Sequence, residues 1–66
     1  LGYFEDALTY FKDALKLKLN DSTIICNIGV CHLYLNENQK AKESFELALK
    51  IDKNDEVAKK WLEKII

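Results

Sequence analysis

The sequence repeats itself with a period of 34 residues, and this periodicity restricts the fold more than any other feature of the chain. When the sequence is shifted by 34 positions, eight of the first 21 residues meet an identical residue. Ordinary composition would give about one or two such identities by chance. The matching residues are Leu1, Ala7, Phe11, Ala14, Leu15, Lys16, Asn20 and Asp21, which fall on Leu35, Ala41, Phe45, Ala48, Leu49, Lys50, Asn54 and Asp55. A period of this length is typical of arrays of helical hairpins.

Composition supports a helical chain and narrows the classes of partner. Proline is absent, glycine occurs twice, and the 66 residues carry a net charge of −1 with both signs interleaved. Such a surface offers no basic field for nucleic acid, and the apolar runs are too short to cross a bilayer. We expect neither nucleic acid nor membrane as a partner. The chain begins at Leu1 rather than Met, and we expect it to be a piece of a longer protein.

Apolar periodicity and capping signals predict four helices. The predicted ranges are Phe4 to about Lys18, Thr23 to Leu35, Gln39 to Ile51 and Glu56 to Ile65. Asn20-Asp21-Ser22 and Lys53-Asn54-Asp55 provide preferred N-cap residues. Gly2 and Asn36, one period apart, are the residue types that best tolerate a left-handed turn. The predicted fold is all-α, with about four helices forming antiparallel helix-turn-helix hairpins.

Each helix has a side that we expect to pack against its neighbours. These sides consist of Ala7, Phe11, Ala14, Leu15 and Leu17; Ile24, Ile25, Ile28, Cys31 and His32; Ala41, Phe45, Ala48 and Leu49; and Val57, Ala58, Trp61, Leu62, Ile65 and Ile66. Gly29 lies in the middle of the second helix, where glycine costs about 1 kcal/mol relative to alanine. We attribute its presence to close contact with the next helix.

The order of these residues resembles the tetratricopeptide repeat family over the whole chain. The family's Trp-x2-Leu-Gly-x2-Tyr appears as Ile25-x2-Ile28-Gly29-x2-His32, followed by an intact Ala-x3-Phe-x2-Ala at Ala41, Phe45 and Ala48. The family's terminal proline is replaced by Lys53. The resemblance implies a single unit over residues 1–66. It divides into the second helix of one repeat (1–21), a complete repeat (22–55) and a C-terminal capping helix (56–66).

The two ends of this unit are expected to differ. Lys59 and Glu63 stand where the family has its aromatic residue and its glycine, which indicates that no second helix packs there. The last helix would therefore cap the array. The first helix lacks its own partner, so we expect Leu8, Phe11 or Leu15 to expose apolar surface that can drive self-association.

The resemblance implies a protein-interaction scaffold that holds a partner peptide or helix in a concave groove. Helical phase gives the groove-lining candidates Thr23, Cys26, Asn27, Val30, Leu33 and Tyr34. Asn27 would fix the orientation of the partner, while Val30, Leu33 and Tyr34 would supply contact area. A competing interpretation is that Leu33 and Tyr34 pack on adjacent repeats.

Some members of the family hold the C-terminal peptide of chaperones in a carboxylate clamp of Lys, Asn and Arg. Asn27 stands at the asparagine of that clamp, but Val57 and Trp61 occupy the places where the following helix would offer its cations. We do not expect a chaperone C-terminal peptide as the partner.

The remaining reactive side chains predict no enzyme, no cofactor and no metal site. Cys26 and Cys31 are five residues apart on one helix, about 140° around its axis, so they can neither bridge nor converge on a metal with His32. A reduced, cytoplasmic setting fits them. Nothing indicates a catalytic triad or a phosphate-binding loop. Two alternatives to a binding scaffold stay open: a self-association module, and a targeting module attached to an enzyme outside these residues.

Overall fold

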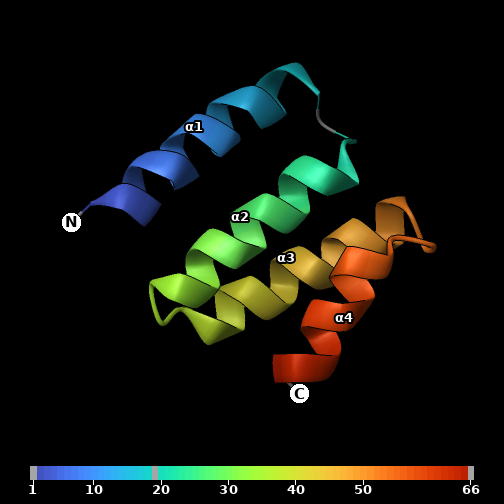
Figure 1. Cartoon of the computed structure of the whole chain (residues 1–66). Coiled ribbons are helices and arrows are strands. Elements are labelled where there is room, and N and C mark those ends of the chain that lie inside the picture. The colour runs from blue at the N-terminus through green and yellow to red at the C-terminus, as the bar shows by residue number, and fades with distance from the viewer. Residues whose placement is uncertain (1, 19, 66) are drawn as a thin grey trace.

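A computed structural model describes residues 2–18 and 20–65, which form four helices in sequence (Figure 1). They are α1 (Tyr3–Leu17), α2 (Ser22–Tyr34), α3 (Asn38–Ile51) and α4 (Glu56–Ile65). Each helix packs on the next along the chain, so α1 lies at one edge and α4 at the other. The all-α hairpin fold is confirmed, and every predicted helix end lies within one residue of the observed one.

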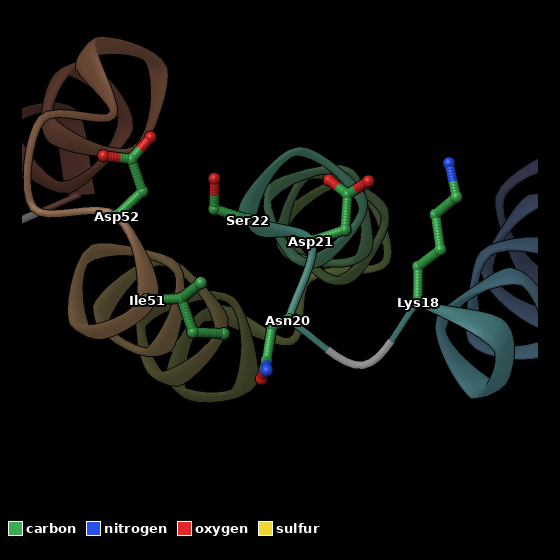
Figure 2. A pocket seen from close by; sticks show the side chains of 6 residues that line it. All are labelled: Lys18, Asn20, Asp21, Ser22, Ile51 and Asp52. Atoms are coloured by element: carbon green, nitrogen blue, oxygen red, sulfur yellow. The ribbon is translucent and has the colours of Figure 1, made fainter.

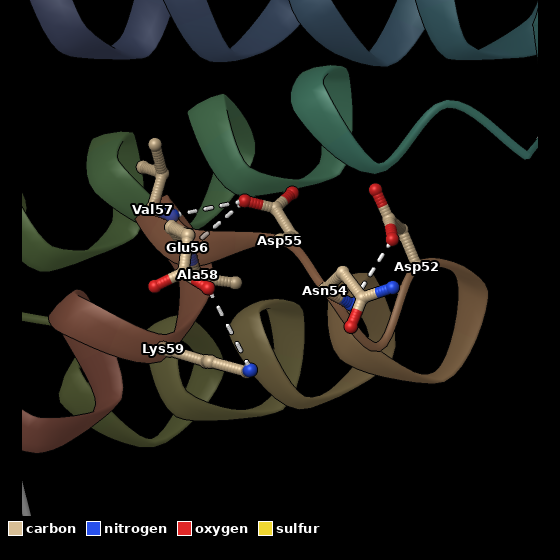
Figure 3. A network of polar contacts seen from close by, with 7 residues as sticks. All are labelled: Asp52, Asn54, Asp55, Glu56, Val57, Ala58 and Lys59. Carbon is tan, nitrogen blue, oxygen red and sulfur yellow. Dashed lines mark hydrogen bonds and ion pairs between the residues drawn. The ribbon is translucent and has the colours of Figure 1, made fainter.

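Two aspartates one period apart begin α2 and α4 in the same way. Asp21 Oδ1 accepts hydrogen bonds from the backbone N–H groups of Thr23 and Ile24, at 3.0 and 3.2 Å. Asp55 Oδ1 accepts from the N–H groups of Val57 and Ala58, at 3.1 and 3.2 Å (Figure 3). These bonds satisfy N–H groups that the first turn of a helix leaves without partners.

The predicted left-handed positions are also present. Gly2 has φ 75° immediately before α1, and Asn36 has φ 63° between α2 and α3. After Asn36, the N–H of Glu37 donates to the carbonyl of His32 at 2.8 Å. This bond closes the turn that reverses the chain between the two central helices.

The core lies where α2, α3 and α4 meet, around a fully buried Phe45. A Cβ atom built on Gly29 would stand 2.7 Å from Phe45 Cε1, so α2 approaches α3 as closely as its glycine allows. On the other side, the Trp61 ring stacks on Phe45 with centroids 5.9 Å apart and planes 2° from parallel. The close contact predicted for Gly29 is confirmed. The buried cluster consists of Ile25, Cys26, Ala41, Phe45, Ala48 and Ala58.

Two residues expected on packed sides face water instead. Leu17 is 88% exposed and Val57 is 54% exposed. Each lies about 80–100° around its helix from the centre of the packed side, beyond the reach of the neighbouring helix. Ile66, expected beside Val57, lies outside the described residues.

The first helix packs less completely than the others. No described residue of α1 is fully buried. Leu8, Phe11 and Leu15 are half-buried, and Leu15 packs against the core. The most exposed large apolar side chains of α1 are Tyr3, Tyr10 and Leu17, rather than the three residues expected.

Within the residues described, none of the helices combines the length and the apolar character needed to cross a membrane.

Candidate protein-interaction groove

One side of α2 carries a row of accessible side chains at helical spacing. Thr23, Asn27, Val30 and Tyr34 are separated by four, three and four residues, which places them within about 60° of one another around the helix. Thr23 is exposed, Asn27 and Val30 are half-buried, and Tyr34 is 58% exposed. Four of the six predicted groove residues therefore share one side of α2.

The other two predicted residues turn toward the core. Cys26 is 2% exposed and belongs to the buried cluster around Phe45, so its assignment to the groove is wrong. Leu33 is half-buried and packs against the same cluster, as Val30 of the accessible row also does. Cys26 and Leu33 both lie about 70–90° from the centre of the accessible row, on the flank where α2 is covered by the rest of the fold.

A cavity of about 220 Å³ opens beside this row, between α1 and α2. We call it the α1–α2 groove; its lining consists of Tyr3, Phe4, Ala7, Phe11, Asn27, Val30 and Cys31. The lining is mainly apolar, and Asn27 adds an amide that can both donate and accept hydrogen bonds. An apolar concavity with few polar groups is suited to holding part of another molecule.

The α1 side of the groove was not assigned to a site from the sequence. From the sequence, Ala7 is expected on the packed side of its helix and Phe11 both there and among residues that expose apolar surface, while no sequence pattern assigns Tyr3 or Phe4 to a site. Phe4, Ala7 and Phe11 are separated by three and four residues, so they share one side of α1. That spacing was the available signal. What the sequence lacked was the angle at which α1 meets α2.

Tyr34 is partly engaged already. Its ring stacks on Phe4 of α1, with centroids 4.8 Å apart and planes 9° from parallel. Tyr3 in turn meets Phe4 edge to face at 5.0 Å. One face of the Tyr34 ring is therefore covered by the neighbouring helix, while more than half of the residue's surface stays accessible.

A second cavity, of about 390 Å³, is lined by Lys12, His32, Lys40, Glu43, Ser44 and Leu47. Of these lining residues, the buried His32 pairs through Nδ1 with Glu37 Oε1 at 2.7 Å, and Lys40 Nζ lies 3.8 Å from Glu37 Oε2. The hydrogen bond from His32, helped by the charges of the two lysines, holds the pKa of Glu37 below its ordinary value. The His32–Glu37 pair stabilises the turn between α2 and α3.

A third cavity, of about 510 Å³, lies where the turn before α2 passes beside the end of α3 (Figure 2). Its carboxylates are Asp21 and Asp52. Asp21 is engaged by the cap of α2, and Asp52 Oδ1 accepts from the N–H of Asn54 at 3.0 Å (Figures 2 and 3). The two carboxylates therefore stabilise the turn before α2 and the turn after α3 by accepting backbone hydrogen bonds.

The two cysteines are unpaired, and the described residues contain no cluster of metal ligands. Cys26 and Cys31 are both free and buried. Burial, together with the nearby Asp55 carboxylate, raises the pKa of the Cys26 thiol to about 11. No group of three or more His, Cys, Asp or Glu side chains among residues 2–18 and 20–65 is placed to hold a metal ion.

Comparison with known proteins agrees with this geometry. A family description, Tetratricopeptide repeat, matches residues 22–55. The BBSome complex member BBS4 of Xenopus tropicalis is 36% identical over 55 residues, which is 83% of this chain. The Mus musculus and Bos taurus proteins of the same name are 36% and 34% identical over the same length. The chain spans only 11% of the length of each relative. No solved structure matches it. The helical hairpins, the Gly29–Phe45 contact and the matched repeat together show that the chain belongs to the tetratricopeptide repeat family.

Proposed function

We propose that this chain is a non-catalytic protein-interaction module that binds a peptide or helix of a protein partner in the α1–α2 groove. The observation that carries the proposal is the position of the accessible row of α2 beside the uncovered apolar side of α1. No described residue of α1 is fully buried, so this side is free to bury further apolar area. A scaffold role also fits the relatives, whose name describes them as members of a complex.

Each residue of the accessible row would have a distinct role. The Asn27 amide would pair with polar groups of the partner and so fix its orientation. Val30, which lines the groove, and Tyr34, which stands over Phe4, would supply apolar contact area. Thr23, one turn before Asn27, would extend the surface toward the start of α2.

The partner is not expected to be an acidic C-terminal peptide. Val57 and Trp61 stand on α4 where a carboxylate clamp requires cations, and Trp61 is engaged in stacking on Phe45. The free, buried thiols Cys26 and Cys31 fit a cytoplasmic setting.

A library of short random peptides displayed on phage provides the test. Selected peptides are expected to bind the chain in calorimetry and to lose at least about tenfold in affinity with Asn27→Ala and with Tyr34→Glu. Tyr10→Glu is the matched control, because Tyr10 is an exposed aromatic of α1 outside the groove lining. Tyr34→Glu should keep its helicity and nearly its melting temperature. Binding that resists both substitutions in the accessible row of α2 would contradict the proposal, and unfolding of Tyr34→Glu would make Tyr34 a core residue.

Self-association is the second candidate, favoured by the exposure of Tyr3, Tyr10 and Leu17 along α1. An apolar surface of this kind can be covered by a second copy of the chain. Light scattering over a wide concentration range separates the candidates: a constant monomer mass supports partner binding, whereas a concentration-dependent dimer supports self-association.

We also propose that α4 caps the array, as its sequence indicates. Glu63 stands one period after Gly29 and is exposed. A second helix packed on α4 as α3 packs on α2 would bring an aromatic ring to position 63, where the glutamate side chain leaves no space for it.

A further inference from the structure

A polar cavity between α1 and α3 has no part in the proposed function. Its volume is about 390 Å³, and three helices contribute to it. The lining consists of Lys12 from α1, His32 from α2, and Lys40, Glu43, Ser44 and Leu47 from α3. The four residues of α3 are separated by three, one and three positions, so they share one side of that helix. We call this space the α1–α3 cavity; it shares no lining residue with the α1–α2 groove.

His32 is the buried residue of this lining. Its Nδ1 is bonded to Glu37 Oε1 at 2.7 Å. Because the pKa of Glu37 lies below its ordinary value, this carboxylate is ionised at neutral pH and Nδ1 is the donor of the pair. No buried side-chain nitrogen or oxygen in the described part of the chain lacks a hydrogen-bond partner, so Nε2, which makes no hydrogen bond to the described residues, is accessible. The opening beside the ring is the α1–α3 cavity.

Two lysines from different helices bring positive charge to the cavity. The charges of Lys12 and Lys40 both lower the pKa of Glu37, so they act on the same small region. Lys40 Nζ lies 3.8 Å from Glu37 Oε2, and Lys12 forms no ion pair with residues 2–18 or 20–65. Glu43 is the acidic residue of the lining, and Gln39 Nε2 donates to its Oε2 at 3.3 Å. Two lysines against one glutamate leave the lining with an excess of positive charge.

We propose that the α1–α3 cavity binds the phosphate group of a phosphorylated side chain of a protein partner. Lys12 and Lys40 would pair with the phosphate oxygens, and the hydroxyl of the half-buried Ser44 would donate to one of them. Leu47, which is 47% exposed at the cavity, would cover apolar atoms of the residues next to the phosphate. A free phosphate ion has no such atoms, and this favours a partner chain as the source of the group.

Phosphate fits these groups better than a carboxylate does. In a neutral imidazole whose Nδ1 is the donor, Nε2 carries a lone pair. A carboxylate at neutral pH only accepts hydrogen bonds, so it would face that lone pair without a proton between them. A phosphate monoester has its second pKa at about 6, so its monoanion offers an O–H to Nε2 and still has oxygens for the two lysines and for Ser44.

The probe is a capped three-residue peptide, leucine-phosphoserine-leucine, titrated into the intact chain at neutral pH. The peptide is expected to bind, and its unphosphorylated form is expected not to bind. Lys12→Gln and Lys40→Gln should each weaken binding about fivefold, and Glu43→Gln should strengthen it about twofold, because a repelling charge is removed. Lys60→Gln is the matched control: it removes the same charge from an exposed position of α4 outside the cavity and should bind like the wild type. Binding that both cavity lysine substitutions leave unchanged would overturn the inference.

Nitrogen NMR tests the part assigned to His32. The chain contains a single histidine, so the ring signals belong to this residue. The Nε2 resonance should shift along the same saturation curve as peptide binding, while Nδ1, which is held by Glu37, should move less. An Nε2 resonance that stays unchanged at saturation would overturn the assignment. Because this measurement uses the unaltered protein, it does not depend on whether a variant of His32 folds.

The remaining outcomes identify the source of the phosphate group. The phosphopeptide should bind more tightly than inorganic phosphate, and Leu47→Ser should remove this difference. Inorganic phosphate that binds as tightly as the phosphopeptide would make a free ion the ligand and overturn the partner assignment. Lys12-dependent binding to phosphatidylcholine vesicles that carry phosphatidylinositol phosphate, without binding of the phosphopeptide, would assign the cavity to a lipid headgroup. Equal binding of a peptide with glutamate in place of phosphoserine would overturn the preference for phosphate. The α1–α2 groove is tested separately, since none of these variants alters its lining.

Discussion

Gly29 and Phe45 approach each other so closely that a single methyl group on the glycine would stand 2.7 Å from the phenylalanine ring. A glycine in the middle of a helix costs about 1 kcal/mol in helix propensity. Removing a buried phenylalanine ring from a core typically costs about 3–5 kcal/mol. The helix propensity lost at Gly29 is therefore smaller than the stability gained from the ring, because the glycine permits complete burial of Phe45 between α2 and α4.

The first prediction is that Gly29→Ala destabilises the chain although alanine is the better helix former. The gain of about 1 kcal/mol in propensity is opposed by overpacking against Phe45, which typically costs about 1–3 kcal/mol. We expect a lower urea midpoint, followed by circular dichroism. In the double variant with Phe45→Leu, the cost of the alanine should shrink, because the shorter side chain leaves room for it. A raised midpoint for Gly29→Ala alone would show that Phe45 moves aside without cost.

The second prediction concerns the two aspartate caps. Asp21→Ala and Asp55→Ala should each lower the free energy of unfolding by about 1 kcal/mol, because two backbone N–H groups lose their acceptor in each case. Asp21→Asn and Asp55→Asn are the controls: asparagine also caps well, so these variants should stay close to the wild type. Equal losses for the alanine and asparagine variants in chemical unfolding would assign the effect to charge instead of capping.

Much of this fold was predictable because it depends on local signals that recur with the period. The caps, the left-handed Asn36 and the small residue at position 29 each follow from one residue type at one place. Two registers of the repeat agree on the caps, at Asp21 and Asp55, and on the left-handed residue, at Gly2 and Asn36. These features depend on backbone geometry and on the two helices of one hairpin.

The groove was harder to predict because it depends on the angles between helices. Helical phase separates an exposed side from a packed one but does not fix the boundary between them. Cys26 and Leu33 lie at that boundary, and the neighbouring helices cover them. Val57 lies at the corresponding boundary of α4 and is left exposed. The contribution of Phe4 required the distance between α1 and α2, which no local pattern contains.

The third prediction is a loss of stability in acid that depends on Glu37. The hydrogen bond from His32 holds the pKa of Glu37 below its ordinary value of 4.5, so the folded state binds this proton less readily than the unfolded chain. Stability from the pair is complete above pH 4.5 and is lost as the pH falls through the lower, folded-state pKa. Urea midpoints measured from pH 7 to pH 3 should fall less steeply for Glu37→Gln than for the wild type. Glu63→Gln, at an exposed position of α4, is the control and should follow the wild-type curve. If the urea midpoint of Glu37→Gln falls as steeply with pH as that of the wild type, the His32–Glu37 pair is not the cause of the loss of stability in acid.

The fourth prediction concerns alkaline pH and the buried thiol of Cys26. Burial, and secondarily the carboxylate of Asp55, raises its pKa from 9.0 to about 11, so the folded state disfavours the thiolate that the unfolded chain forms more readily. Stability from this group is complete below pH 9 and is lost as the pH rises toward 11. Urea midpoints should decline more over this range in the wild type than in Cys26→Ala.

At neutral pH the native thiol should react with iodoacetamide about a hundredfold more slowly than the unfolded one, since two pKa units reduce the thiolate fraction by that factor. Asp55→Asn, which keeps the cap, should raise the native rate; equal native and unfolded rates would place Cys26 at the surface.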